Sequence, residues 1–286
     1  HPDSMSLQTT VEGTDTSLTI DRTEQVRIIG ERINPRPESD LAEALANENM
    51  DPVRELAIDQ VENGADLIDV NVDVDGVEKE TVLPMAVEAV ADAVDVPIVI
   101  DTNYDDADAL EAALEVTPGK PIINSVSMES PSLDAILPLV ADYGTAVIGL
   151  TMDEAGPPDD AETRAEFAAA LLEEATQHDI PPEDVIIDPL ALPLSSNSEI
   201  GAEILTAMER IRDELGNNIT LGLSNISFEM PERERINDLF LAMAIQSGLS
   251  VPIVNAGETR EAILLADLMM GRDDFAKRFL SYYRSK

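Results

Sequence analysis

The chain has 286 residues, and 44% of them are hydrophobic, so it can bury a large core as one large domain or two small ones. It contains no cysteine and only two histidines, which excludes disulfides and thiolate chemistry and argues against a multi-histidine metal site or a histidine-dependent triad. Its 58 acidic and 18 basic residues give a net charge of −40, which repels nucleic acid and anionic membranes.

The acidic residues are spread over nearly every predicted helix rather than held in one block. Two explanations fit this charge: an interaction surface for a basic partner, or adaptation to high salt. Screening over ~3 Å at 1 M salt tolerates dense carboxylates on a surface. The even spread favours the halophilic explanation. The charge then indicates the salt concentration in which the protein works and does not indicate what chemistry it carries out.

The chain is expected to be a soluble, cytoplasmic protein. No apolar run approaches the ~20 residues of a membrane span, and the N-terminus lacks the apolar core of a signal peptide. Residues 1–4, ahead of Met5, resemble an expression scar. Residues 1–25 are polar and are predicted to form a loosely attached extension, followed by a single domain over residues 26–286.

Short apolar stretches alternate with amphipathic stretches along the rest of the chain. The first helix is expected to end at Gly64, which suits a helix C-terminal cap. The predicted strands are 26–30, 67–70, 97–100, 121–123, 146–150, 184–187, 219–223 and 251–254. The predicted helices are 51–63, 77–93, 105–115, 132–142, 160–176, 199–215 and 232–247, with one or two more over 258–283.

Eight strand-then-helix units in about 260 residues predict an α/β fold of the (β/α)₈ type, a TIM barrel. The apolar strands are of the kind that is buried on both faces. An open doubly wound sheet is the alternative, but that fold usually has a glycine-rich phosphate turn after its first strand, and this chain has none there.

Polar residues follow almost every predicted strand, and in a barrel these positions converge on one mouth. Helix capping could explain any one of these residues. It does not explain why nearly all of them are Asp or Asn, because Ser, Thr and Gly would cap a helix equally well. The set is almost wholly Asp and Asn, with Arg32 as the only nearby cation. The residues are Glu31, Asn34, Asp69, Asn71, Asp101, Asn103, Asn124, Asp153, Asp188, Asn225 and Asn255.

A mouth of carboxylates and amides suits either of two kinds of ligand. Several Asp oxygens could hold a divalent metal ion. Alternatively, Asp accepts hydrogen bonds from the ring N–H and amino groups of a heterocycle, and Asn pairs with its amide-like edges. The scarcity of basic residues argues against a phosphorylated substrate, which usually requires Arg or Lys. The spacing does not separate the metal from the heterocycle.

Eight short motifs occur in order and at plausible spacing between residue 30 and about residue 257. Together they make the sequence resemble the pterin-binding methyltransferases. This group includes methyltetrahydrofolate:corrinoid protein methyltransferase and the folate-binding module of cobalamin-dependent methionine synthase. The motifs are GERIN (30–34), NGADLIDVN (63–71), IDTN (100–103), INSVS (123–127), IGLTM (148–152), IDP (187–189), LGLSNIS (221–227) and FLAMA (240–244).

The resemblance implies roles for individual residues. Asp101, Asn124 and Asp188 match the residues that hold the amino and amide-like edge of the pterin ring. Asn225 matches the amide that hydrogen-bonds N5, the nitrogen that carries the methyl group. Two further polar residues of the mouth, Asp69 and Asn71, also match. The third motif is one residue shorter than the usual pattern, which puts Asn103 in doubt, and the loop beyond Asn225 departs from the pattern as well.

The resemblance also implies the reactants. Methyltetrahydrofolate and tetrahydrofolate, or a related pterin, would be the substrates, and the cobalt of a corrinoid (cobalamin) held by another protein would exchange the methyl group. A tertiary amine is a poor leaving group, so N5 must gain a proton or a strong hydrogen bond, worth on the order of 10²–10⁴-fold in rate. The resemblance suggests a homodimer, and no bound metal is expected.

Two alternatives remain. Dihydropteroate synthase is a more distant relative whose pyrophosphate ester substrate calls for basic residues, and Arg260 is the only late candidate in this sequence. A non-catalytic barrel that binds a pterin or a metal ion is the other alternative.

Overall fold

Seven parallel strands form one curved sheet in the computed structural model, which describes residues 6–285. The proposed scar at residues 1–4 therefore lies outside the described residues. The strand order is β8-β7-β6-β5-β4-β3-β9, so β3 to β8 pair with their neighbours in sequence, and β9 pairs with β3. They are β3 (Ile29–Ile33), β4 (Leu67–Asn71), β5 (Ile98–Asp101), β6 (Ile122–Ser127), β7 (Ala146–Leu150), β8 (Val185–Asp188) and β9 (Ile253–Val254).

The segment 219–222 closes the ring between the two edges of this sheet. Ile219 pairs in parallel with Ile187 of β8, and Gly222 pairs in parallel with Ile253 of β9. The Thr220 amide donates to the Ile187 carbonyl at 2.9 Å. The predicted seventh strand is thus a bonded segment rather than a regular strand, and it runs directly into a 3-10 turn at Leu223–Ser227. The predicted (β/α)₈ barrel is confirmed.

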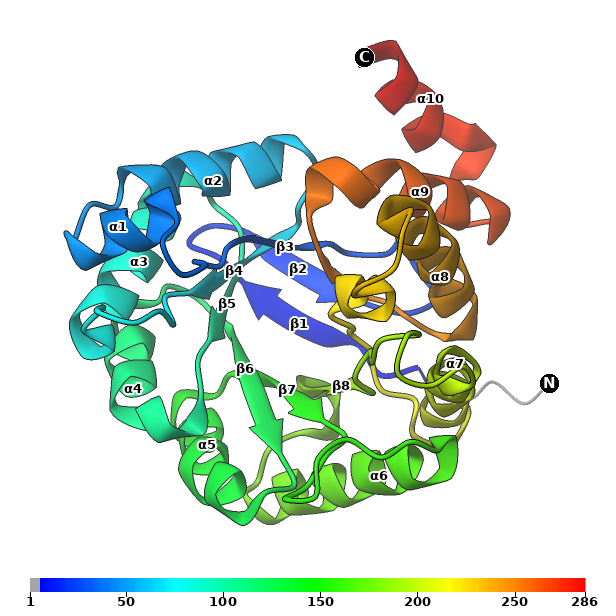
Figure 1. The fold of residues 1–286 in the computed structure, drawn as a ribbon, viewed down its shortest axis with the longest axis horizontal. Helices are drawn as coiled ribbons and strands as arrows, with labels where there is room; N and C mark the ends of the chain where they lie inside the picture. The colour runs from blue at the N-terminus through cyan, green and yellow to red at the C-terminus, as the bar shows by residue number, and fades with distance from the viewer. Residues whose placement is uncertain (1–5, 286) are drawn as a thin grey trace.

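Helices surround the ring on its outside (Figure 1). Most predicted helices are present, although α7 ends at Arg210 and continues as a π-helical turn over Ile211–Leu215. One helix was not predicted, α1, in the loop after β3. The helices are α1 (Asp40–Ala46), α2 (Asp51–Glu62), α3 (Lys79–Ala93), α4 (Ala107–Val116), α5 (Ser130–Tyr143), α6 (Ala161–Gln177), α7 (Ile200–Arg210), α8 (Arg233–Ser247), α9 (Ala256–Met269) and α10 (Lys277–Ser285).

The N-terminal residues form an antiparallel hairpin of β1 (Thr9–Glu12) and β2 (Ser17–Ile20) that lies across the ring (Figure 1). Val11 and Ile20 are fully buried against the first residues of several barrel strands, Ile29 and Leu67 among them. The hairpin therefore covers the amino end of the barrel. The prediction that this stretch is loosely attached was wrong, because Val11 and Ile20 are buried and Asn218 donates hydrogen bonds to the hairpin.

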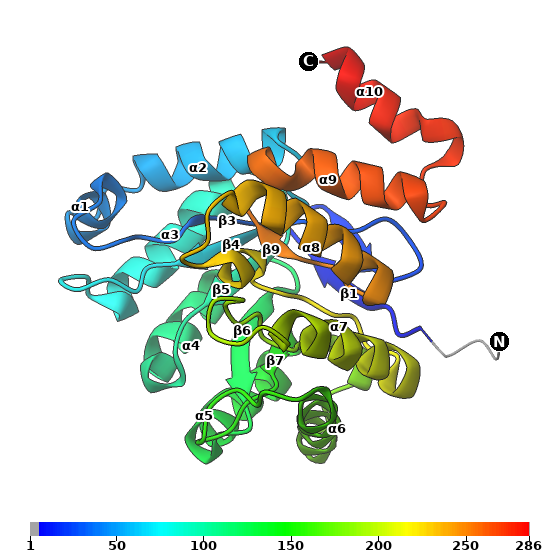
Figure 2. The same ribbon diagram turned by 45° about the vertical axis from the view of Figure 1, so that its right-hand side comes forward.

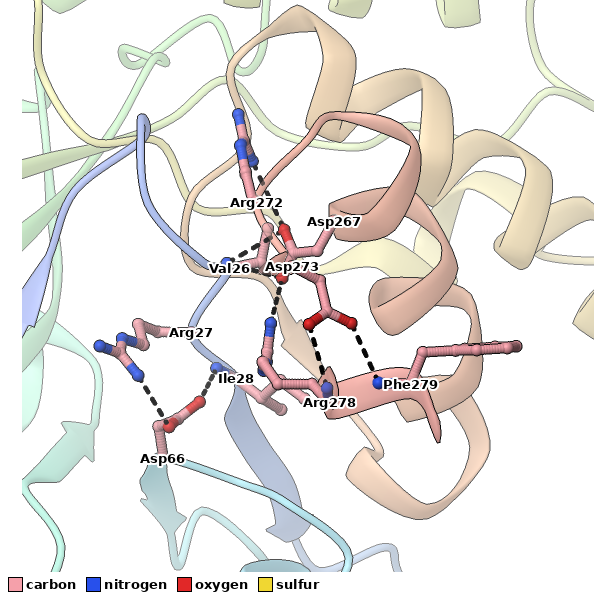
Figure 3. A network of polar contacts seen from close by, with 9 residues as sticks. All are labelled: Val26, Arg27, Ile28, Asp66, Asp267, Arg272, Asp273, Arg278 and Phe279. Atoms are coloured by element: carbon pink, nitrogen blue, oxygen red, sulfur yellow. Dashed lines mark hydrogen bonds and ion pairs between the residues drawn. The ribbon is translucent and has the colours of Figure 1, made fainter. Parts of the chain in front are cut away.

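The first barrel strand begins three residues later than predicted. Val26 is buried, but its amide donates to the Asp267 carboxylate at 3.2 Å and not to a neighbouring strand. Asp267 also accepts a hydrogen bond of 2.8 Å from Arg278 of α10, and Figure 3 shows the arrangement of these residues. This network joins the entry of the barrel to the last two helices, and α10 itself projects away from the ring (Figure 2).

None of the described helices is both long and apolar enough to cross a membrane.

Candidate functional site

The interior of the barrel changes from apolar to polar along each strand. Alternate residues of a strand face the same side, and the apolar cluster beneath the hairpin includes Ile29, Leu67, Val99, Ile122 and Ile186. The residue two positions further along each of these strands faces the same interior, nearer the carboxyl end. Those residues are Glu31, Asp69, Asp101, Asn124 and Asp188. The predicted mouth is therefore the polar upper layer of the barrel interior.

Four of the predicted site residues are joined by hydrogen bonds on three adjacent strands. Asn71 of β4 lies opposite Asp101 of β5, and its amide donates to that carboxylate at 2.9 Å. Asn124 of β6 lies opposite Asp101 and donates to Asp69 at 3.3 Å. Each amide thus fixes one carboxylate, and both keep an oxygen that can accept a further hydrogen bond.

Burial raises the pKa of the carboxyl groups in this layer. The pKa of Asp69 lies well above its usual range because of burial and the charge of Asp101. Burial also raises the pKa of Asp101. Burial and the charges of Glu258 and Asp101 raise the pKa of Glu31 to about 7. These groups cannot all ionise together at neutral pH, so the layer retains protons that isolated carboxyls would lose.

Asp188 stands at the end of β8, two strands away from Asn124 of β6. Its carboxylate accepts a hydrogen bond of 2.8 Å from the Leu190 amide. Burial raises the pKa of Asp188 to about 7, although the charge of Arg164 acts in the opposite direction. No hydrogen bond joins Asp188 to the Asn71–Asp101 group among the described residues. The common feature of these groups is their position in one layer.

A pocket of about 1000 Å³ opens beside this layer, and Asn225 and Glu31 both line it. Asn225 follows the segment that closes the ring and lies in the 3-10 turn after Gly222. Asp69, Asp101, Asn124 and Asp188 are not among the residues that line this pocket. Glu31 connects the two parts of the site, because it lines the pocket and its charge raises the pKa of Asp69.

The pocket contains more cations than the sequence indicated. Arg36 and Arg233 line it together with Arg32, so the prediction that Arg32 is the only nearby cation was wrong. Arg233 is the first residue of α8, and its guanidinium donates to the Ser224 carbonyl at 2.8 Å. These residues were missed because they come from a loop and a helix start, whose direction cannot be read from strand ends.

Arg260, the late basic residue considered in the sequence, lies elsewhere. Its guanidinium donates to the Glu62 carbonyl at the end of α2 and stacks over the ring of Tyr282 at 5.4 Å. The pocket lining does not include it.

The remaining predicted mouth residues divide between the pocket and local turns. Asn34 lines the pocket. Asn255 lines it too, and it also caps α9 by accepting from the Gly257 amide. Asn103 instead donates to Asp73 at 2.9 Å, and Asp153 accepts from the Ala155 amide in its own turn. Helix capping therefore accounts for Asn255, and a local turn accounts for Asp153.

No three His, Cys, Asp or Glu side chains within residues 6–285 are grouped so that they could hold a metal ion.

Comparison with known proteins gives two kinds of likeness. A family described as "Pterin binding enzyme" matches residues 30–255. The chain is 30% identical over 263 residues to a methylcorrinoid:tetrahydrofolate methyltransferase of Eubacterium limosum, covering 90% of this chain and 96% of that protein. It is 29% identical over 267 residues to methionine synthase of Mycobacterium tuberculosis, where 89% of this chain corresponds to only 22% of the relative.

Solved structures of dihydropteroate synthases share the fold. The Yersinia pestis enzyme with a pterine-sulfa conjugate has a TM-score of 0.69 at 20% identity, covering 93% of this chain and 99% of that chain. The Thermus thermophilus enzyme has a TM-score of 0.67 at 21% identity, covering 91% and 99%. At such identities the likeness concerns the architecture alone.

Proposed function

The chain belongs to the family of pterin-binding enzymes, and from this premise we propose that it transfers a methyl group between N5 of methyltetrahydrofolate, or a related methylpterin, and a corrinoid carried by another protein. The relative with 30% identity over nearly its whole length is named for this exchange. The observation that carries the proposal is the combination of an Asp and Asn layer inside the barrel with an adjoining open pocket that contains Asn225.

The buried layer suits the polar edge of a pterin ring. That edge presents an amino group and a ring N–H as donors and a carbonyl oxygen as acceptor. Asp101 and Asp188 would accept from the donors, and Asn124 can donate to the carbonyl and also accept. Asp69 and Asn71 would hold Asp101 and Asn124 in place through the contacts described above. The ring would thus be recognised by groups already fixed before it arrives.

Asn225 would act at N5. When the methyl group leaves, N5 changes from a tertiary to a secondary amine and must receive a hydrogen bond or a proton. The Asn225 amide can supply the hydrogen bond, an interaction that strengthens as charge develops at N5. Glu31 lines the same pocket with a pKa of about 7 and can hold a proton there near neutral pH. The corrinoid of the partner protein supplies the cobalt that accepts or donates the methyl group.

The pocket cations would suit the acidic tail of a folate. Arg32, Arg36 and Arg233 face a space of about 1000 Å³, and guanidinium groups bind carboxylates through paired hydrogen bonds. The same cations could bind a pyrophosphate ester, so they also weaken the argument against dihydropteroate synthase activity. That activity is therefore kept as the second candidate, and the two are distinguished by assay.

The test is to mix the protein with methyltetrahydrofolate and reduced free cobalamin at molar salt and to follow the absorption spectrum. Formation of methylcobalamin is expected, and its absence would count against the proposal. A parallel incubation with the pterin pyrophosphate and p-aminobenzoate is expected to give no dihydropteroate. Product in the second assay alone would favour the synthase.

We further propose that the enzyme works as a homodimer without a bound metal ion, inside a cell with a high internal salt concentration. The resemblance supports the dimer, and the net charge of −40 supports the salt adaptation. Residues 26–286 would form the catalytic domain.

A further inference from the structure

Arg164 of α6 is a fully buried arginine, the largest of the fully buried side chains. Removing a guanidinium from water is costly unless its charge is paired and its donors are satisfied. None of the ion pairs found within residues 6–285 involves Arg164. Its Nε and Nη2 are buried without a hydrogen-bond partner, so the contacts of this cation are those of Nη1 alone.

The guanidinium of Arg164 is directed at the turn that follows Asp188. Its Nη1 donates to the carbonyl oxygens of both Pro189 and Leu190, the latter at 3.0 Å. The Leu190 amide in turn donates to the Asp188 carboxylate at 2.8 Å. The Leu190 amide orients Asp188, and the carbonyls of Pro189 and Leu190 lie on either side of that amide in the chain. Arg164 therefore holds the backbone on both sides of it.

Leu190 has a conformation that needs such support. Its φ is +65°, in the left-handed region that side chains other than glycine adopt at a cost. A leucine remains there only when its surroundings hold it. Because this conformation directs the Leu190 amide at Asp188, the orientation of Asp188 depends on whatever keeps the turn in place.

Arg164 also acts on Asp188 through charge. The guanidinium opposes the rise in the pKa of Asp188 that burial causes. The other carboxylates that face the guanidinium are Asp159 and Asp160, just before α6, and Glu203 of α7. Asp160 and Glu203 are engaged with α6 itself, since they accept hydrogen bonds from the Thr163 and Ala161 amides.

We propose that Arg164 is a positioning residue for ligand recognition: it clamps the 188–190 turn so that Asp188 presents an oriented, ionisable carboxylate to the polar edge of the pterin. This inference rests on the proposed function for the identity of the ligand. Arg164 does not contact the pterin in this arrangement and acts only through the turn and through Asp188. Its clamping role and its charge can be separated by substitution.

The first test compares Arg164→Lys, which keeps the charge but is one bond shorter, so that its amine does not reach the position of Nη1, with Arg164→Met, which loses both the charge and the donor. Tetrahydrofolate binding is measured by calorimetry from pH 5.5 to pH 9. Both variants are expected to weaken binding by about tenfold or more at pH 8, since a buried hydrogen-bonded group is lost. Affinity is expected to increase with pH as Asp188 ionises. Only Arg164→Met should shift this increase to higher pH, because only it removes the charge that favours ionisation. Arg210→Met, which removes a partly exposed arginine of α7, is the matched control and should bind as the parent does.

A rescue experiment tests the clamp itself. Glycine adopts a positive φ without steric cost, so Leu190→Gly should restore much of the affinity lost in Arg164→Lys. Unchanged binding in Arg164→Lys would overturn the inference, and so would a double variant that binds no better than Arg164→Lys. Because these two variants keep the buried charge, they decide the question even where Arg164→Met does not fold.

A ligand-free measurement separates this inference from the proposed function. Carbon-13 NMR of the Asp188 carboxyl, assigned with Asp188→Asn, reports its pKa without any pterin. The pKa should be higher in Arg164→Met than in the parent, even where the parent binds no tetrahydrofolate. Equal pKa values would overturn the electrostatic half of the inference, whereas a parent that binds no folate would contradict only the proposed function.

Discussion

Asn71 and Asp101 lie opposite each other on adjacent strands, and the Asn71 amide donates a hydrogen bond of 2.9 Å to the Asp101 carboxylate. The bond favours the ionised form of a carboxyl whose pKa burial raises. It therefore helps Asp101 to act as a hydrogen-bond acceptor near neutral pH. Removing the amide should weaken the binding of any ligand that donates a hydrogen bond to Asp101.

Asn71→Ala is accordingly expected to weaken tetrahydrofolate binding at pH 7 by about tenfold, because a half-buried, charge-assisted hydrogen bond is lost. Isothermal calorimetry gives the affinity. Asn47→Ala is the control, since it removes an exposed amide that only donates to the Glu43 carbonyl of α1. Equal affinities in Asn71→Ala and the parent would show that this pair does not support the ligand.

Asn225→Ala should separate turnover from binding. The amide is assigned to N5, where charge develops during transfer, so kcat is expected to fall by about 10²-fold. The pterin ring is held by other residues, so the dissociation constant should change by less than about threefold. Stopped-flow measurement of methylcobalamin formation at saturating folate gives kcat. Collapsed binding with an intact rate would contradict the role given to Asn225.

Asp188→Asn should make stability less dependent on pH. The folded pKa of Asp188 is about 7, above its ordinary value of 3.8, so the protonated form stabilises the fold at low pH. This contribution is lost as the pH rises from about 4 through 7. The free energy of unfolding of the parent should fall relative to Asp188→Asn by roughly 1–3 kcal/mol between pH 5 and pH 8.

Urea titrations at the two pH values measure this difference, and parallel stability curves would contradict it. The asparagine can still accept from the Leu190 amide, so the local turn should persist. Tetrahydrofolate binding should nevertheless weaken, since a neutral amide replaces the carboxylate.

Asp267→Ala should destabilise the fold. The buried carboxylate accepts hydrogen bonds from the Val26 amide and from Arg278 (Figure 3). The substitution leaves both donors without this acceptor. Arg278 is 33% exposed, so the main cost is that of the hydrogen bonds lost, about 1–3 kcal/mol. Chemical denaturation at pH 7 measures the cost. Glu214→Ala, which removes a surface pair with Arg210, should cost less than about 1 kcal/mol.

Salt should raise the stability of the protein. A net charge of −40 repels itself within a compact fold, and the repulsion is screened over ~3 Å at 1 M salt. The melting temperature is expected to rise steadily between 0.2 M and 3 M potassium chloride, by about 10 °C or more. A melting temperature independent of salt would contradict the halophilic interpretation.

Much of the architecture follows from the sequence because each barrel strand is a short apolar run. The runs give the number and order of the strands, and the residue after each run falls at the barrel mouth. Where apolar residues serve another purpose, the prediction is wrong. Val26 is buried in the core although it lies before the first strand, and its amide donates to Asp267 of α9 instead of to a strand.

The site was predictable only where it lies on the strands. Asp69, Asp101, Asn124 and Asp188 stand two residues after interior apolar positions, a spacing that the sequence displays. Arg36 and Arg233 come from a loop and from the start of a helix, so nothing in the local pattern directs them to the pocket. The clamp formed by Arg164 depends on a contact between α6 and a turn 25 residues away, which no local pattern reveals.

The N-terminal hairpin is held by Asn218, a residue that is translated about 200 residues after it. The Asn218 side chain donates to the Thr9 hydroxyl and to the Leu7 and Ile20 carbonyls, immediately before the segment that closes the ring. About 200 residues of chain must therefore be synthesised before the hairpin can find this partner. Contacts of such long range form slowly. The floor of the barrel should be among the last parts to fold, and a nascent chain would expose its apolar strand ends until then.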